Sequence, residues 1–432
     1  MNKVPTPKRE STDTDTFDQH ESSVASYGKS FPRVFHKASG SYIYDVDGGA
    51  YLDFLAGAGS LNYGHNHPIL ANALASYITE GGIVHSLDLH TKAKQGFLEA
   101  LNEIVLEPRG LDYVAQFTGP TGTNAVEAAL KLARRLKGRT TVVSFTNGFH
   151  GVSLGALAAT GNYYHRSAAQ MPLTGVIPMP YDGFMRDDMD TLAFFEQMVT
   201  DHSSGLDHPA AVILETVQGE GGLNTASMPW LRRLREICDR HDMVMIVDDI
   251  QAGCGRTGTF FSFEPADIKP DIITLSKSIS GFGLPMAIAL IRRELDEWQP
   301  GEHNGTFRGH NYAFVTAAAA IKHFWSDDSF SKDVIRKSGI LNELLTEIVE
   351  SIPGHGLRVK GRGMMQGLDC VDGKTATAVS QAAYRRGLII ETSGPDGEVV
   401  KCLCPLTISD EDLKKGLKIV HDSAAEVLGA AS

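Results

Sequence analysis

The sequence predicts an α/β fold in which helices cover a mostly parallel central sheet, beside a smaller α+β domain built from both termini. Three observations predict it. Short, nearly continuous apolar runs recur through the middle of the chain, stretches with helical periodicity lie between them, and the two ends are patterned differently. Uninterrupted apolar runs are typical of strands covered on both faces. Strands that alternate with helices form mostly parallel sheets.

Five apolar runs are the expected strands of the central sheet. They span residues 141–145, 211–215, 243–247, 272–275 and 286–291. The third run leads into Asp248 and Asp249, and the fourth leads into Ser276 and Lys277. Ligands of open α/β sheets bind beyond the carboxyl ends of the strands. We therefore expect these polar residues at the site.

Residues 124–137 give the clearest helical pattern. Apolar residues recur there at spacings of three and four, and basic residues occupy the other side. Gly138 ends the pattern, as a glycine after a helix commonly does. The helix follows the Gly-Pro-Thr-Gly-Thr run at residues 119–123.

The two ends of the chain are expected to form the smaller domain together. The Asp-Val-Asp-Gly-Gly run at residues 45–49 predicts a hairpin turn, and an amphipathic helix is expected near residues 413–427. A chain of 432 residues suits two packed domains. The expected divisions are 1–75 and 335–432 for the small domain and 76–334 for the large one. The first fifteen or so residues are expected to be a mobile tail.

Composition and charge exclude several classes of protein. The net charge of −12 disfavours nucleic acid and anionic membranes as partners. No run of eighteen apolar residues predicts a membrane span, and the polar N-terminus lacks a secretory pattern, so a cytoplasmic protein is expected. The five cysteines form neither a disulfide framework nor a metal-ligand pattern, and reduced thiols without a metal site are expected.

Three features together predict a site for pyridoxal 5′-phosphate (PLP). A lysine at a buried strand end, here Lys277, is desolvated and becomes a nucleophile for a carbonyl, although a lone lysine more often reaches the surface. Asp248 ends another strand and suits the pyridine nitrogen of PLP, or else a salt bridge or a helix cap. The helix start at residues 119–124 can bind phosphate through its free N–H groups, although any capped helix looks similar.

Eight segments resemble the class III (ω-amino acid) aminotransferases of the PLP fold-type I group, in the order typical of that family. The similarity runs from about Ser30 to the C-terminal helix. The segments are residues 64–68, 122–128, 149–151, 215–222, 247–253, 255–258, 276–277 and 305–307. The resemblance implies an enzyme that transfers amino groups between small molecules.

The resemblance also implies how the cofactor is held. Lys277 would carry PLP and move a proton during transfer, and Asp248 would keep the ring nitrogen protonated. Gln251 would contact the ring hydroxyl, and Phe149 would stack on the ring. The phosphate would be bound by Gly122 and Thr123, and by Thr306 of a neighbouring subunit. A homodimer at least, and possibly a tetramer, is therefore expected.

The substrate side of the site departs from the family pattern. Glu220 matches the family's acidic gate near the substrate carboxylate. Lys401 stands where the family usually has an arginine for that carboxylate, and a lysine lacks the bidentate geometry. Arg308 is a second candidate, and Asp249 replaces a usual glutamate.

Four further residues are expected to support the fold rather than the chemistry. For the histidines of the matched segments, turn-forming or packing roles are expected, and Arg256 is expected to be structural. These residues are His65, His67, His150 and Arg256.

Within the class, further stretches resemble the members that supply L-2,4-diaminobutyrate to ectoine synthesis. They include residues 117–123, 248–256, 301–309, 362–367 and 389–394. The implied reaction moves the amino group of L-glutamate to L-aspartate 4-semialdehyde. Departures at Ala25, Cys402 and Cys404 leave open a homologue that supplies a siderophore or peptide pathway.

Other activities stay open from the sequence alone. An ω-aminotransferase for ornithine or 4-aminobutyrate is the main alternative, and a racemase or aminomutase on the same fold is another. A non-catalytic PLP-binding regulator is disfavoured because the N-terminal stretch has no helix-turn-helix pattern.

Overall fold

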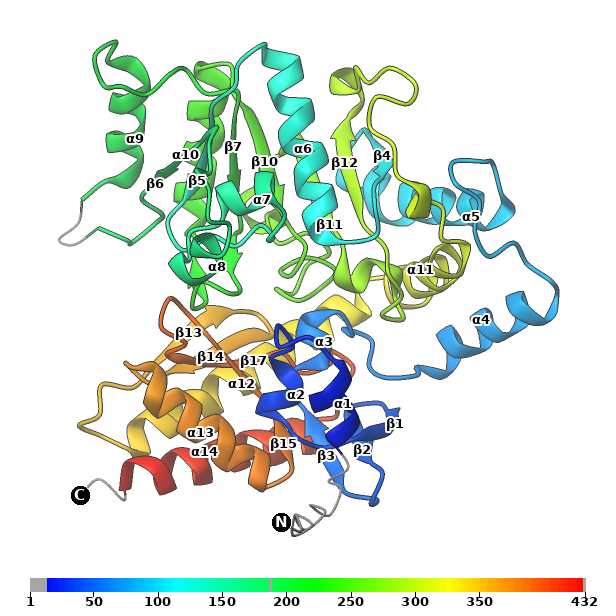
Figure 1. The fold of residues 1–432 in the computed structure, drawn as a ribbon, viewed down its shortest axis with the longest axis vertical. Helices are drawn as coiled ribbons and strands as arrows, with labels where there is room; N and C mark the ends of the chain where they lie inside the picture. Colours follow the sequence, from blue (N-terminus) through cyan, green and yellow to red (C-terminus); the bar gives the residue numbers. More distant parts are fainter. Residues whose placement is uncertain (1–13, 186–188, 430–432) are drawn as a thin grey trace, which may run out of the picture.

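The computed structural model describes residues 14–185 and 189–429. The tail expected at the N-terminus lies almost wholly outside these residues. Figure 1 shows the central sheet and its helices in the upper half of the molecule, and elements from both ends of the described chain in the lower half. None of the helices in the described ranges is both long and apolar enough to cross a membrane.

The central sheet has seven strands within the described residues, of which six run in one direction and one runs in the other. Their order is β4 (Tyr113–Phe117), β12 (Ile288–Arg292), β11 (Ile272–Leu275), β10 (Val244–Asp248), β7 (Ala211–Leu214), β5 (Val142–Phe145) and β6 (Val176–Met179). β12 is the reversed strand, antiparallel to its neighbours, β11 and β4. The expected mostly parallel sheet is confirmed, and the five expected strands lie within two residues of their predicted bounds. β4 and β6 were not expected.

Helices cover both faces of this sheet. In β10, Met245 and Val247 belong to the same core cluster as α10 (Met228–Arg240), α5 (Lys92–Ala100) and α11 (Asn311–Phe324). The alternate residues Val244 and Ile246 belong to the cluster under α6 (Gly122–Lys137). Both faces of the strand are thus buried, which explains why its sequence is uninterruptedly apolar.

The lower half combines segments from the two ends of the chain. One sheet orders β1 (Phe35–Ser39), β2 (Tyr42–Asp45), β3 (Ala50–Asp53) and β15 (Leu388–Ile389). The other orders β13 (Arg358–Arg362), β14 (Met365–Asp369), β17 (Val399–Cys402) and β16 (Glu391–Ser393). The predicted hairpin joins β2 to β3, and β3 pairs with β15 from the far end of the chain.

Long helices complete this half around one apolar core. They are α12 (Ser329–Ser351), α13 (Gly373–Arg385) and α14 (Asp410–Gly429), and α14 contains the helix expected at residues 413–427. Leu52 and Phe54 share this core with residues of all three helices. The expected domain boundaries fall inside α12 and inside α4 (Pro68–Thr79), and the division at those positions stays a prediction.

The remaining elements are short. The helices are α1 (Asp15–His20), α2 (Tyr27–Ser30), α3 (Ala56–Gly59), α7 (Leu154–Ala159), α8 (Tyr163–Ser167) and α9 (Thr191–Thr200), with a π-helical turn, η1 (Leu101–Leu106). The 3₁₀ turns are η2 (Glu107–Arg109), η3 (Glu264–Ala266), η4 (Lys277–Ser280), η5 (Arg293–Leu295) and η6 (Thr306–Arg308). A small hairpin pairs β8 (Val217–Gln218) with β9 (Asn224–Thr225).

Candidate active site

The carboxyl ends of β10 and β11 open into a cavity of about 180 Å³. Asp248, the last residue of β10, pairs in register with Thr274 of β11, and Lys277 follows that strand by two residues. The cavity is lined by Gly122, Thr123, Phe149, His150, Gly151, Glu215, Glu220, Asp248, Ile250, Gln251, Ser276 and Lys277. Parallel pairing therefore brings together most of the residues expected at the cofactor.

Lys277 has the features of a lysine held ready for a carbonyl. Its backbone is left-handed, with φ of 49°, a conformation that costs a non-glycine residue of order 1 kcal/mol. Its side chain is half-buried and makes neither a hydrogen bond nor an ion pair with any described residue. Burial lowers the pKa of Lys277, and the negative charge of Glu220 opposes that shift only in part. A lowered pKa supplies more of the neutral, nucleophilic amine.

Asp248 is fixed by three donors, one of which is His150. The Nδ1 atom of His150 lies 2.7 Å from one carboxylate oxygen of Asp248. The Thr274 hydroxyl and the Ile250 N–H donate to the other oxygen, over 3.0 and 3.2 Å. Burial lowers the pKa of His150, but the hydrogen bond and the charge of Asp248 raise it above its ordinary value. The pair is therefore suited to orient the Asp248 carboxylate toward a pyridine nitrogen.

The start of α6 and the nearby Gly151 form one wall of the cavity. Gly122 and Gly151 leave the backbone there open to a ligand. A Cβ atom added at Gly122 would lie 2.9 Å from the side chain of Ile250. One added at Gly151 would lie 2.4 Å from the Thr123 hydroxyl, which pairs with the Ser153 hydroxyl at 2.6 Å. First-turn N–H groups have no partner within their own helix and attract anions. This corner suits a phosphate group.

Gln251 and Phe149 complete the cavity. The amide nitrogen of Gln251 donates to the Ala58 carbonyl and to Glu220, whereas its Oε1 atom is buried without a hydrogen-bond partner in the described residues. The Phe149 N–H donates to Glu215 at 2.8 Å. Burial and the charge of Asp248 raise the pKa of Glu215 to about 7, against the opposing charge of His150. The cavity thus suits PLP, because it combines the Lys277 amine, the Asp248 carboxylate, the Phe149 ring and a phosphate-binding helix start.

Lys401 lies behind Glu220 and is fully buried. Its ammonium contacts Glu220 at 2.9 Å, Glu391 at 3.0 Å and the Gly219 carbonyl at 3.2 Å. Burial alone would lower the pKa of Lys401, but the two carboxylate charges raise it well above its ordinary value. Lys401 also lowers the pKa of Glu220, against the effect of burial. The expected cation is thus present, and it is already paired with two carboxylates.

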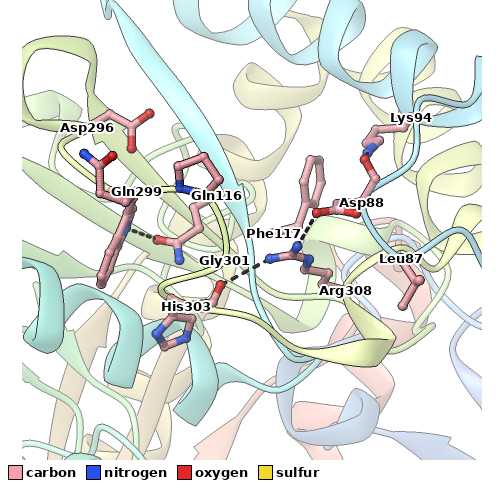
Figure 2. Close-up of a pocket in the computed structure, with 12 residues that line it drawn as sticks. Leu87, Asp88, Lys94, Gln116, Phe117, Asp296, Gln299, Gly301, His303 and Arg308 are labelled. Carbon is pink, nitrogen blue, oxygen red and sulfur yellow. Dashed lines mark hydrogen bonds and ion pairs between the residues drawn. The ribbon is translucent and has the colours of Figure 1, made fainter.

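Thr306 and Arg308 do not line the Lys277 cavity within this chain. Figure 2 shows Arg308 at a different cavity, of about 310 Å³, beside Leu87, Lys94 and His303. Arg308 is ion-paired with Asp88 and donates to the His303 carbonyl. Thr306 is exposed, as its expected contact with another subunit would require. Both roles stay predictions.

Among the four residues expected to support the fold, His150 differs most from expectation. It contacts Asp248 directly, whereas a turn-forming or packing role had been expected. His65 contacts Asp53 at 2.7 Å, and His67 precedes α4 and packs on Phe324. Glu215 and Glu391 lie inside segments that resemble the family, but the sequence predicts no role for either.

Asp249 and Arg256 are both buried and hydrogen-bonded. Asp249 accepts bonds from the N–H and hydroxyl groups of Ser262. Burial raises the pKa of Asp249 to about 7. Arg256 donates to the carbonyls of Cys404 and Met364 and to Asn62, and so ties the central part of the chain to both ends. A structural part for Arg256 agrees with these contacts.

Comparison with known proteins gives the chain a family context. The model of the family described as aminotransferase class-III matches residues 23–423. A diaminobutyrate–2-oxoglutarate transaminase of Vibrio parahaemolyticus is 57% identical, over 96% of this chain and 98% of its own length. The protein of that name from Halomonas elongata is 56% identical, over 96% and 99%. The solved ornithine aminotransferase of Toxoplasma gondii superposes with a TM-score of 0.83 at 25% identity, covering 96% of this chain and 94% of its own.

Proposed function

This chain belongs to the class III aminotransferase family, and from that premise we propose that it makes L-2,4-diaminobutyrate. It takes the amino group of L-glutamate, releases 2-oxoglutarate and passes the group to L-aspartate 4-semialdehyde. The observation that carries the proposal is the cavity in which Lys277, Asp248 and the start of α6 meet. The identity of more than half the positions with diaminobutyrate transaminases supports the choice of substrate.

The cofactor is PLP, which supplies an electron sink through which an amino group leaves one substrate and joins the next. Lys277 holds the cofactor and moves the proton that the substrate carbon loses and regains. Asp248, held by His150 and Thr274, keeps a positive charge on the ring nitrogen. Gly122, Thr123 and the first turn of α6 bind the phosphate.

The second subunit is part of the proposal. Thr306 is exposed, and the neighbouring Phe307 is 66% exposed, although a phenylalanine side chain gains by burial. Further exposed apolar side chains on the segment that follows α4 support a contact surface here. They are Ile83, Val84, Leu87 and Leu89. In a homodimer joined at this surface, Thr306 contacts the phosphate in the partner's site, and Arg308 is available to a substrate carboxylate there.

We further propose that the enzyme works in the cytoplasm and that its product enters ectoine synthesis. Five free, buried cysteines support a reducing compartment. Supply of diaminobutyrate to a siderophore or peptide pathway is the alternative for the product. Ornithine is the alternative substrate, which the structural likeness to an ornithine aminotransferase favours.

A donor panel tests the proposal. Holoenzyme receives 2-oxoglutarate with 2,4-diaminobutyrate, ornithine or 4-aminobutyrate, and the glutamate formed is measured. We expect diaminobutyrate to give the highest kcat/KM. Glutamate formed mainly from another donor would contradict the substrate but not the family. No glutamate from any donor would contradict amino transfer itself.

A further inference from the structure

Glu391 faces Lys401 directly across two paired strands. The two residues are register partners in the antiparallel pair of β16 and β17, and the ammonium nitrogen lies 3.0 Å from Oε1 of Glu391. The Tyr27 hydroxyl donates to the other oxygen, Oε2, at 2.9 Å. The Glu391 side chain is only 7% exposed. Because Glu391 is buried, faces Lys401 within the sheet and accepts a hydrogen bond from Tyr27, its carboxylate has little freedom to move.

Glu220, the other partner of Lys401, is more exposed than Glu391, and it also accepts a hydrogen bond from Gln251. It lies in a turn between Gly219 and Gly221, and its side chain is 31% exposed. It lines the Lys277 cavity, and it lines a second cavity of about 270 Å³ together with Glu391 and Tyr27. A substrate carboxylate that approaches from Lys277 can therefore replace Glu220 at Lys401. Lys401 then still keeps its other carboxylate, that of Glu391.

The charges of this cluster do not cancel. One ammonium is paired with two carboxylates, which leaves one net negative charge beside the cofactor cavity. Burial raises the pKa of Glu391, whereas the charge of Lys401 and the hydrogen bond from Tyr27 oppose that shift and favour the ionised carboxylate. By contrast, the arginine that the family usually has in place of Lys401, if paired with Glu220 alone, would leave no net charge.

We propose that Glu391 sets the charge preference of the substrate site by acting as the fixed counter-ion of Lys401. The inference rests on the proposed function, because it concerns the two products named there, which are the substrates of the reverse reaction. 2,4-Diaminobutyrate carries two ammonium groups and one carboxylate, and the negative cluster attracts it. 2-Oxoglutarate carries two carboxylates, and the same cluster weakens its binding. Glu391 is thus a positioning residue that acts on substrates through Lys401 and through its own charge.

The variant Glu391→Gln tests this inference because it should improve the use of 2-oxoglutarate and impair the use of 2,4-diaminobutyrate. We expect the KM for 2-oxoglutarate to fall, and kcat/KM for 2,4-diaminobutyrate to fall, each by about three- to tenfold, the effect of one charge several ångströms away. A residue that only supports packing would worsen both constants. A variant that uses both substrates better, uses both worse, or is unchanged with both would overturn the proposal.

A matched control separates charge from structure. Glu343→Gln removes an exposed carboxylate from α12. We expect it to leave both constants within about twofold of wild type, below the effect of a nearby charge. Should the Gln variant not fold, Glu391→Met fills a similar volume without a polar group, and the same two constants are measured.

A binding measurement keeps this test apart from that of the proposed function. Titration calorimetry gives the dissociation constant of glutarate, a dicarboxylate that cannot react, for holoenzyme and variant. We expect Glu391→Gln to bind glutarate about three- to tenfold more tightly. Wild-type enzyme that does not turn over diaminobutyrate would refute the proposed function, whereas equal glutarate affinities would refute the part given to Glu391.

Discussion

His150 and Asp248 are joined by a buried hydrogen bond of 2.7 Å between Nδ1 and a carboxylate oxygen. The bond links the segment that carries Phe149, the expected ring-stacking residue, to the carboxylate expected at the ring nitrogen. Because Asp248 also receives bonds from Thr274 and from the Ile250 N–H, its orientation is set by three separate parts of the chain. The electrostatics of the cofactor ring therefore depend on a histidine that need not contact the ring.

Replacement of His150 tests this dependence. A hydrogen bond to a charged group contributes about 1.5–3 kcal/mol, so we expect His150→Phe to lower kcat/KM by about 10- to 100-fold. The absorbance of the bound cofactor, followed against pH, should shift as well. His36→Phe, at an exposed position of β1, is the control. Unchanged kcat/KM and an unchanged spectrum would contradict a part for His150 at the ring.

The cavity wall at Gly151, where the phosphate is expected to bind, has no room for a side chain. A Cβ atom there would lie 2.4 Å from the Thr123 hydroxyl, and φ is +124°, which only glycine adopts readily. We expect Gly151→Ala to weaken PLP binding by at least about tenfold, or about 1.4 kcal/mol, as the phosphate corner shifts. Fluorescence titration of apoenzyme measures this. Gly339→Ala, in α12 with open space around it, should bind PLP normally and be slightly more stable.

Asp249 gives a pH dependence of stability. Burial raises the pKa of Asp249 from 3.8 to about 7. Between these two values the folded protein keeps a proton that the unfolded chain has released, so stability falls as the pH rises through this window. Asp249→Asn removes that loss. The Tm of the variant relative to wild type should therefore be higher at pH 8 than at pH 5.

The exposed residue Asp207 provides the matched control for this measurement. Asp207→Asn should change Tm equally at both pH values. A Tm difference for Asp249→Asn that is the same at pH 5 and pH 8 would show that the carboxyl is not titrating in this window.

Phe307 tests the subunit contact. We expect Phe307→Asp to place a charge in the interface and to shift the protein toward monomer in sedimentation velocity experiments. PLP binding should weaken with it, because Thr306 of the partner is lost from the phosphate. Phe184→Asp changes an equally apolar exposed residue elsewhere and should leave the assembly intact. A Phe307→Asp protein that stays dimeric with normal PLP affinity would contradict this surface.

Much of the fold was predictable because both faces of the central strands are buried, which leaves continuous apolar runs such as residues 272–275. β4 and β6 were missed because their burial is incomplete: Gln116 and Pro178 interrupt their apolar patterns. Lys277 and Asp248 were predictable because each stands where an apolar strand ends. Glu391 was not, since its partner Lys401 is ten residues away and only the register of β16 and β17 brings the two charges together.

Amino transfer that depends on Lys277 is tested most directly by a half-reaction in a single turnover. Glutamate is added to wild-type holoenzyme and to Lys277→Ala reconstituted with PLP, and the cofactor spectrum and 2-oxoglutarate are followed together. We predict that wild type forms one 2-oxoglutarate per site, whereas the variant binds PLP but is slower by at least about 10⁴-fold, as expected when a reacting group is removed. A variant that forms 2-oxoglutarate at a rate near that of wild type would contradict the account.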